Sequence, residues 1–533
     1  MIISIRDWLD RTLGDLMRQL RWSFLPPLMV YFAAGVSGLT SVVGTFFVKD
    51  QLGLSAAFLA GLTFWAGLPW VLKMPLGHLV DLFWRHKAVL VWCGASLIAT
   101  SLAIMYGLVA HADAMRAVMP VESWYVLAAL LAPSGYVVQD VVADAMTVEA
   151  IPVADETGAP FTKDLSRAMH TTMQTLGRFS IISGFAVVAA VNIYIFSDVE
   201  ALDPALKTNL YARVYLIALV IPALSVSGVL LHGAIQRRMA SPGAAPEVPG
   251  QETATEPNWQ ILGGGLAFVI MTVAIGLSDI AYAQEIVFAG SMLIVCFLIS
   301  RLIRVLSVDQ ARMLIGTAVI IFVFRAVPLP GPGLSWFEID ELGFDERFLS
   351  ILSLITSVLT LVGLVVLRPL MTRRSIAYIV VLLTIAAGVL SLPNIGLYQG
   401  VHEWTAARTG GVVDARFIAI LDTAIESPLG QVAMVPMLAW IARNAPAELK
   451  ATFFAVMASF TNLALSASSL ATKYLNEVFT VTRQVVDRDT GQVTVAADYS
   501  ELGILLILVA LLVVALPLMA VALVQMSRFQ TSE

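Results

Sequence analysis

Long apolar segments recur from one end of the chain to the other, separated by shorter polar segments. Each apolar segment has about 20 residues with few or no charges, which as a helix is enough to cross a hydrocarbon layer of about 30 Å. This pattern predicts about fourteen membrane-spanning helices. They are expected at residues 25–47, 56–80, 88–110, 123–147, 165–196, 211–231, 261–277, 282–306, 313–329, 348–370, 376–395, 417–441, 451–475 and 504–524.

The predicted spans fall into a six, two, six arrangement, which gives an all-α polytopic membrane protein. We expect five parts, at residues 1–24 (an amphipathic cytoplasmic N-terminal segment), 25–233 (an N-terminal six-helix bundle), 234–258 (a cytoplasmic linker), 259–306 (an extra helix pair) and 307–533 (a C-terminal six-helix bundle). The N-terminal segment is predicted to lie along the membrane surface because its apolar residues, from Ile5 to Leu20, fall on one helical face. In the extra pair, the run Gly263-Gly264-Gly265 would allow close helix approach.

A short internal repeat supports two related halves. The sequence Asp50-Gln-Leu-Gly-Leu recurs 290 residues later as Asp340-Glu-Leu-Gly-Phe, and a Phe-Leu pair follows each copy at the same distance. Ser55 and Asp345 occupy matching positions before the second span of each half, where a short polar side chain caps free backbone amides. Repeated halves are typical of membrane transporters.

Composition agrees with a membrane protein, since 58% of the 533 residues are hydrophobic and 13% are charged. Soluble domains carry about a quarter charged residues. The two cysteines, Cys93 and Cys296, both lie in apolar segments without a second thiol or histidine at ligand spacing. Neither a disulfide framework nor a metal site is therefore predicted.

The distribution of positive charge predicts the orientation. With the N-terminus in the cytosol, the cytoplasmic loops hold most of the 32 Lys and Arg residues, as the positive-inside rule requires. The even number of spans then puts both termini in the cytosol, in a multi-pass protein of the cell (inner) membrane. The acidic loop at 336–347 and the polar segment at 480–501 would face the exterior.

The end of the second span is a candidate gate. It carries Gly77, Asp81 and Arg85, a pattern that resembles the motif between the second and third helices of the major facilitator superfamily. Gly77 would permit close helix contact, and Asp81 with the following cations would form a cytoplasmic latch that opens and closes during transport. The alternative is a helix cap beside ordinary cytoplasmic positive charge.

Acidic pairs inside the spans are candidates for proton coupling, because an ionisable group within the bilayer is costly unless it is paired or hydrated. Asp140 and Asp144 share a helix face in the fourth span, and Asp422 and Glu426 have the same spacing in the matching helix of the second half. Carboxylates that lie close together in a low dielectric bind protons more readily. The alternative is that these acids pair with cations on neighbouring helices.

Cations inside the spans are candidates for binding an anionic substrate. Arg178 shares a helical stripe with His170 and Gln174, and Arg325 lies in the first span of the C-terminal bundle. Arginine binds carboxylates in a bidentate manner. Lys73 could act likewise, or could neutralise Asp140 or Asp144. The side chains of Trp65, Trp70, Tyr136 and Asn462 could contact a ring, although aromatic residues in spans more often serve packing.

Four stretches of the sequence resemble the folate-biopterin transporter family of the major facilitator superfamily. They are residues 68–77 with Asp81, residues 139–149, residues 335–344, and residues 448–455 leading to Asn462. The resemblance implies proton symport of pterins or folates, with Lys73, Asp140, Asp144 and Arg178 as substrate or coupling residues. The chain departs from the family in its thinned basic cluster Arg85-His86-Lys87 and in the extra helix pair.

Two other functions stay open at this point. Muropeptide permeases are similar around the aspartate motif, and pigment-delivery proteins that act as assembly factors look like relatives. An enzyme is not expected, since the chain has no phosphate-binding glycine loop, metal-spaced histidines or nucleophile and base arrangement. We expect no cofactor and no nucleic-acid partner. The expected partners are a small anionic or heterocyclic substrate, protons and membrane lipid, with the chain acting as a monomer.

Overall fold

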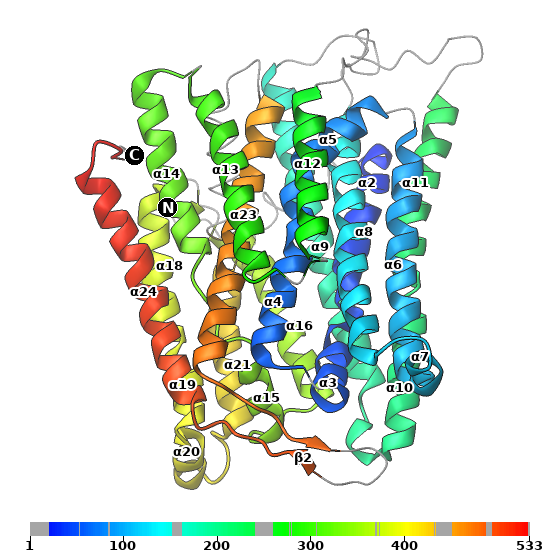
Figure 1. Cartoon of the computed structure of the whole chain (residues 1–533), viewed down its shortest axis with the longest axis vertical. Coiled ribbons are helices and arrows are strands. Elements are labelled where there is room, and N and C mark those ends of the chain that lie inside the picture. Colours follow the sequence, from blue (N-terminus) through cyan, green and yellow to red (C-terminus); the bar gives the residue numbers. More distant parts are fainter. Residues whose placement is uncertain are drawn as a thin grey trace, which may run out of the picture.

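Long helices run side by side along the longest dimension of the molecule (Figure 1). The computed structural model describes residues 21–52, 54–83, 86–151, 163–239, 259–276, 278, 280–304, 306–367, 370–371, 374–430, 432, 450–486 and 493–530. Helices lie at each of the predicted spans. Among the described residues, nine helices are long and apolar enough to cross a membrane, so the number of fourteen crossings stays a prediction. Residues 1–20 of the predicted amphipathic segment lie outside the described residues.

The described residues of the N-terminal half, which we define as residues 21–239, are helical almost throughout. Its elements are η1 (Trp22–Phe24), α2 (Leu25–Val36), η2 (Ser37–Thr40), α3 (Ser41–Gln51), α4 (Ala56–Gly67), η3 (Leu68–Leu72), α5 (Lys73–Leu82), α6 (Lys87–Ala110), α7 (Ala112–Arg116), α8 (Val121–Glu149), α9 (Lys163–Ile195), η5 (Val199–Ala201), α10 (Pro204–Ile217) and α11 (Val220–Met239). The extra pair follows as α12 (Trp259–Gly276) and α13 (Ala283–Ile303).

The C-terminal half, residues 306–530, combines helices with one short hairpin. Its elements are α14 (Val308–Arg325), α15 (Pro332–Asp340), α16 (Glu346–Val366), α18 (Ile376–Leu390), α19 (Leu392–Tyr398), α20 (Val401–Thr409), α21 (Ala415–Glu426), η6 (Ser427–Leu429), α23 (Lys450–Val478), β1 (Val485–Val486), β2 (Val493–Val495) and α24 (Leu502–Met526). The two strands are antiparallel, with Val485 opposite Val495. We call the end of the molecule that holds this hairpin, α3, α10 and α15 the hairpin end (Figure 1).

The two caps predicted from the internal repeat are confirmed. The Ser55 hydroxyl accepts a hydrogen bond from the Phe58 amide at 3.1 Å, and Asp345 accepts one from the Phe348 amide at 2.6 Å. These bonds start α4 and α16 at matching places in the two halves, because each satisfies an amide that the first helical turn leaves free.

Small residues allow the helices of the N-terminal half to approach closely. A Cβ atom on Gly94 of α6 would lie 2.7 Å from the Gly135 carbonyl oxygen of α8, and one on Gly135 would lie 2.5 Å from that of Gly94. Gly35 of α2 and Gly184 of α9 are also close, since a Cβ on Gly35 would lie 2.9 Å from Cα of Gly184 and one on Gly184 would lie 2.8 Å from Cα of Gly35. Such contacts are how helices associate in lipid, where burial of apolar surface gives little driving force.

Two seams join the halves, with α4 packed on α23 and α9 packed on α16. The extra pair covers the first seam, since α12 contacts α5 and α13 contacts both α4 and α23. Gly265 provides the close approach predicted for the glycine run, because a Cβ there would lie 2.5 Å from Cβ of Pro75. Gln284 and Glu285 are adjacent residues of α13. The Gln284 amide donates to the Gly61 carbonyl at 3.1 Å, and the Glu285 carboxylate lies 3.4 Å from the Lys473 ammonium. Adjacent side chains of the extra pair therefore contact opposite halves.

The segment predicted as an acidic exterior loop is partly a buried helix. Trp336 and Phe337 of α15 are 2% and 7% exposed, and both belong to a core that also contains Val481 and Tyr499 from the hairpin segment. Burial of these two aromatic rings holds the acidic segment against the protein, because removing their apolar surface from water is favourable.

Candidate functional site

A broken helix positions Lys73. Helix α4 ends at Gly67, the 3-10 turn η3 follows with a proline at its start, and α5 begins at Lys73. The turn leaves carbonyl groups without helical partners, and α23 supplies donors to two of them. The Asn462 amide donates to the Trp70 carbonyl at 3.1 Å, and the Ser459 hydroxyl donates to that of Val71 at 3.0 Å. Asn462, predicted to contact substrate, thus has its amide nitrogen bound to the backbone of the other half.

The Lys73 ammonium lies between the two predicted carboxylates of α8. Its nitrogen is 2.6 Å from Oδ2 of Asp140 and 2.7 Å from Oδ2 of Asp144. The side chains of Lys73, Asp140 and Asp144 are 23%, 16% and 40% exposed. The spacing of four residues does bring both acids to one helix face, and Lys73 forms an ion pair with each of them in this conformation.

Tyr31 is a member of this cluster that the sequence did not reveal. Its hydroxyl donates to Oδ1 of Asp144 at 2.5 Å, and its ring is 6% exposed. Gly177 of α9 makes room for the ring, since a Cβ there would lie 2.9 Å from Cε2 of Tyr31. A single tyrosine in an apolar segment carries no pattern that would distinguish it from a packing residue.

Arg178 and Arg325 come from opposite halves and lie close enough to act on each other electrostatically. Arg178 is on α9, near Tyr31 and Asp140, and Arg325 is the last residue of α14. The Arg325 Nε atom is buried without a hydrogen-bond partner. In the described part of the chain, neither guanidinium forms an ion pair. Two like charges so placed are unfavourable within a membrane unless an anion joins them.

The acidic pair of the C-terminal half has a third member. Asp422 and Glu426 of α21 interact electrostatically, and one carboxylate oxygen of Asp422 is buried without a hydrogen-bond partner among the described residues. Glu338 on α15 interacts electrostatically with Asp422. Burial and the Asp422 carboxylate raise the pKa of Glu338 to about 7. Glu338 was assigned to an exterior loop by sequence, and only the folding of α15 against the core brings it here.

The predicted gate is mostly beyond the described side chains. Arg85 lies outside the described residues, as do the side chains of Asp81 and Gln174. The close contact expected at Gly77 is not found, since a Cβ there would meet no described atom within 4 Å. Within the same part of the chain, no group of three or more His, Cys, Asp or Glu side chains is arranged to hold a metal ion.

Comparison with known proteins places this arrangement in a family. The sequence profile of the BT1 family matches residues 34–532, which is nearly the whole chain. The chain belongs to the BT1 family. This confirms the resemblance found in the four sequence stretches. A folate-biopterin transporter of Synechocystis is 23% identical to the BT1-family chain over 446 residues, which make up 83% of this chain and 72% of that relative.

Solved structures show that the BT1-family chain has the fold of the major facilitator superfamily. A POT family transporter in complex with 5-aminolevulinic acid is 12% identical with a TM-score of 0.59, and the match covers 97% of this chain and 96% of that one. The nucleoside transporter NupG is 12% identical with a TM-score of 0.55, covering 94% and 98%. The protein is thus a multi-pass membrane protein and a secondary transporter with a small-molecule substrate, not an enzyme.

Proposed function

We propose that the protein transports an anionic heterocycle of the pterin or folate class, which Arg178 and Arg325 bind through its negative charge. One observation carries this proposal: two arginines from opposite halves lie near each other, and neither forms an ion pair with a described carboxylate. A substrate carboxylate would form hydrogen bonds with both arginines and satisfy the buried Nε of Arg325. The folate-biopterin transporter of Synechocystis supports this substrate class.

The same proposal assigns proton coupling to the cluster of Lys73, Asp140 and Asp144. Lys73 holds both carboxylates in this conformation. Protonation of one carboxylate would remove one of the two ion pairs that Lys73 forms, so Lys73 would be held less tightly. A proton could in this way change the position of Lys73, at the break between η3 and α5, and so act on the seam with α23.

The mechanism we propose is rocking of the two halves about the site between them, a mode of transport that repeated halves allow. The bundles at 25–233 and 307–533 would be the moving units, with the pair at 259–306 between them. The hairpin end would face the exterior and both termini the cytosol, in the cell (inner) membrane, with the protein working as a monomer. Charge placement supports this orientation. The start of α2 and the end of α24 both lie opposite the hairpin end, which agrees with an even number of crossings (Figure 1).

Uptake by the purified protein in proteoliposomes tests the substrate class. Labelled folate, a pterin and a muropeptide are each offered with and without an inward proton gradient. We expect the gradient to drive uptake of folate or the pterin, Arg325→Gln to abolish it, and Asp144→Asn to remove its dependence on the gradient. Arg312→Gln is the matched control, because Arg312 lies on the same helix, is 47% exposed and pairs with Asp309.

Each other outcome points to a different function. Uptake of the muropeptide alone would replace the proposed substrate. Folate uptake that Arg325→Gln leaves intact would remove Arg325 from the site. No uptake of any of the three would contradict the proposed substrate class and favour another solute or an assembly role.

A further inference from the structure

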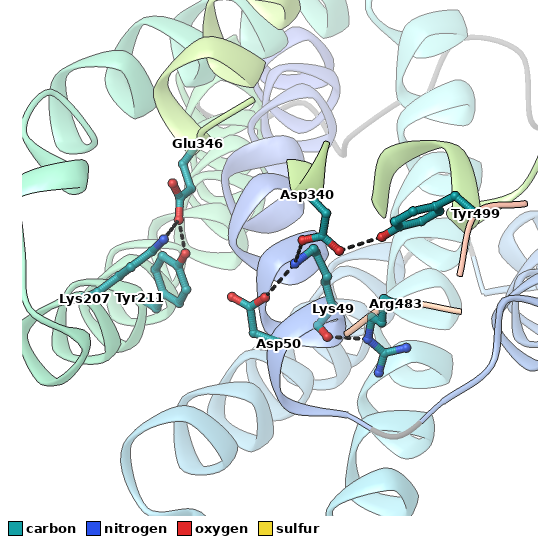
Figure 2. A network of polar contacts seen from close by, with 8 residues as sticks. All are labelled: Lys49, Asp50, Lys207, Tyr211, Asp340, Glu346, Arg483 and Tyr499. Carbon is teal, nitrogen blue, oxygen red and sulfur yellow. Dashed lines mark hydrogen bonds and ion pairs between the residues drawn. The ribbon is translucent and has the colours of Figure 1, made fainter. Parts of the chain in front are cut away.

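Charged side chains bridge the two halves at the hairpin end (Figure 2). Lys49 is the third residue from the C-terminal end of α3. Its Nζ atom lies 2.5 Å from Oδ1 of Asp340, the last residue of α15. Lys207 of α10 lies 2.5 Å from Oε1 of Glu346, the first residue of α16. In both ion pairs the cation belongs to the N-terminal half and the carboxylate to the C-terminal half.

Glu346 depends on the other half for its neutralisation. Its side chain is 1% exposed, and its carboxylate accepts a hydrogen bond from Tyr211 as well as pairing with Lys207. Both partners lie on α10 of the N-terminal half. A carboxylate so deeply buried needs these partners or water, so the halves can separate here only if water reaches Glu346.

The second ion pair is held by the hairpin segment. The Tyr499 hydroxyl donates to Oδ2 of Asp340 at 2.5 Å. Arg483 donates to the backbone carbonyls of Lys49 and Leu54, the latter at 2.9 Å, and its guanidinium lies 4.7 Å from the centre of the Trp336 ring. The segment between α23 and α24 thus reaches across to the turn between α3 and α4 and fastens it to α15.

Ion pairs suit a joint that must open repeatedly. Separating two apolar surfaces into water costs about 25 cal/mol for each Å² exposed, with no compensation. Separated ions recover their hydration, which offsets most of the lost attraction. A cavity of about 350 Å³ at this seam has room for water. It is lined by Ser197 and Asp198 from one half and by Asp345 and Arg347 from the other.

The geometry points to a clasp that closes the hairpin end of the transport pathway in this conformation. Its members are Lys49, Lys207, Tyr211, Asp340, Glu346, Arg483 and Tyr499 (Figure 2). The clasp holds the halves together at one end and releases them when they rock to the opposite state. It rests on the proposed rocking mechanism but on no particular substrate.

The opening of the clasp can be measured with a cysteine introduced at a buried position beside it. Ser350 is 0% exposed and lies one turn after Glu346 on the same face of α16, so it becomes accessible when the halves part at this end. Ser350→Cys is placed in a Cys93→Ser, Cys296→Ser background, and its reaction with a charged maleimide is timed in nanodiscs without substrate. We expect Glu346→Gln and Asp340→Asn each to speed labelling about tenfold or more, which corresponds to about 1.4 kcal/mol in favour of the open state.

Two controls separate opening from unfolding and from a general charge effect. Asp113→Asn removes a carboxylate that is 99% exposed and pairs with Arg116 within the N-terminal half, so labelling should stay slow. A second reporter, Ser101→Cys, is 5% exposed and contacts Ala128 inside the N-terminal half, and it should stay unlabelled in every variant.

The charge swap Lys207→Glu with Glu346→Lys completes the test. Each single change should speed labelling, and the pair should restore the slow rate, because the ion pair forms again with reversed polarity. The proposal is overturned if Glu346→Gln and Asp340→Asn label like Asp113→Asn, if the swap labels as fast as the single changes, or if Ser101→Cys reacts as fast as Ser350→Cys. Since no substrate is present, failure of folate uptake and failure of the clasp are separate results.

Discussion

Tyr31 of α2 donates its hydroxyl hydrogen to Asp144 of α8 at 2.5 Å, although 113 residues separate them in the chain. Asp144 therefore has two partners in this cluster, the Tyr31 hydroxyl and the Lys73 ammonium, whereas the described ion pair of Asp140 is with Lys73. The two carboxylates on one helix face are thus in different surroundings. This difference and the cation pair Arg178 and Arg325 lead to the following predictions.

Tyr31→Phe should destabilise the protein, because it removes a hydrogen bond to a charged group. Such bonds contribute about 1.5–3 kcal/mol. The expected result is a lower melting temperature in detergent. Tyr194→Phe is the matched control, since Tyr194 is 83% exposed and should melt like the wild type. Equal melting of Tyr31→Phe and Tyr194→Phe would show that the hydrogen bond contributes nothing.

Lys73→Gln alone should lower the stability of the folded protein more than Lys73→Gln combined with Asp140→Asn and Asp144→Asn. Removing one partner of a fully buried ion pair costs about 3–5 kcal/mol, and less is expected here because Asp144 is 40% exposed. Neutralising the acids as well removes the uncompensated charge. Melting temperatures of the single, double and triple variants form the cycle that measures this coupling. Additive losses would contradict the shared ion pair.

Arg178→Lys should impair transport almost as much as Arg178→Gln. A lysine keeps the charge but lacks the planar pair of donors that binds a carboxylate in two places. The measurement is the substrate concentration for half-maximal uptake, which we expect to rise about tenfold or more in both variants. Wild-type uptake by Arg178→Lys would mean that the site needs only a positive charge there.

Glu338 should make the stability of the protein depend on pH. Its pKa is raised from 4.5 to about 7 by burial and by Asp422, so between these values the folded protein binds more protons than the unfolded chain. Stability should then fall as the pH rises from about 4.5 to 7, by no more than about 3 kcal/mol. Melting curves at pH 5 and pH 8 should differ less for Glu338→Gln than for the wild type. An unchanged difference would place the titrating group elsewhere.

Glu285→Gln should loosen the extra helix pair from α23. Glu285 is 26% exposed, lies 3.4 Å from Lys473 and accepts a hydrogen bond from Tyr474 at 2.5 Å. We expect a loss of about 1 kcal/mol or more in a melting experiment. Glu477→Gln is the matched control, because Glu477 pairs with the same lysine along α23 at 3.7 Å and is 44% exposed. Exposed pairs of this kind contribute about 0.3–0.5 kcal/mol.

The sequence by itself determined where the long helices lie, where the two halves repeat and which family the chain belongs to. The positions of the long helices and of their caps depend on interactions between residues close together in the chain. Apolar segments long enough for the bilayer become helices, and Ser55 and Asp345 cap amides three residues away. The spacing of Asp140 and Asp144 also fixed their shared face, since it depends only on the helical repeat.

Only the tertiary structure decided what those faces contact. Whether Lys73 pairs with α8 or remains free depends on how a helix break orients it, and no local pattern records that orientation. Tyr31, Glu338 and the clasp at the hairpin end were missed for the same reason: their partners lie more than 80 residues away in the chain, as in the pair of Lys49 with Asp340. Charges acquire their roles from neighbours that packing supplies, so the sequence named candidate groups and the fold chose their partners.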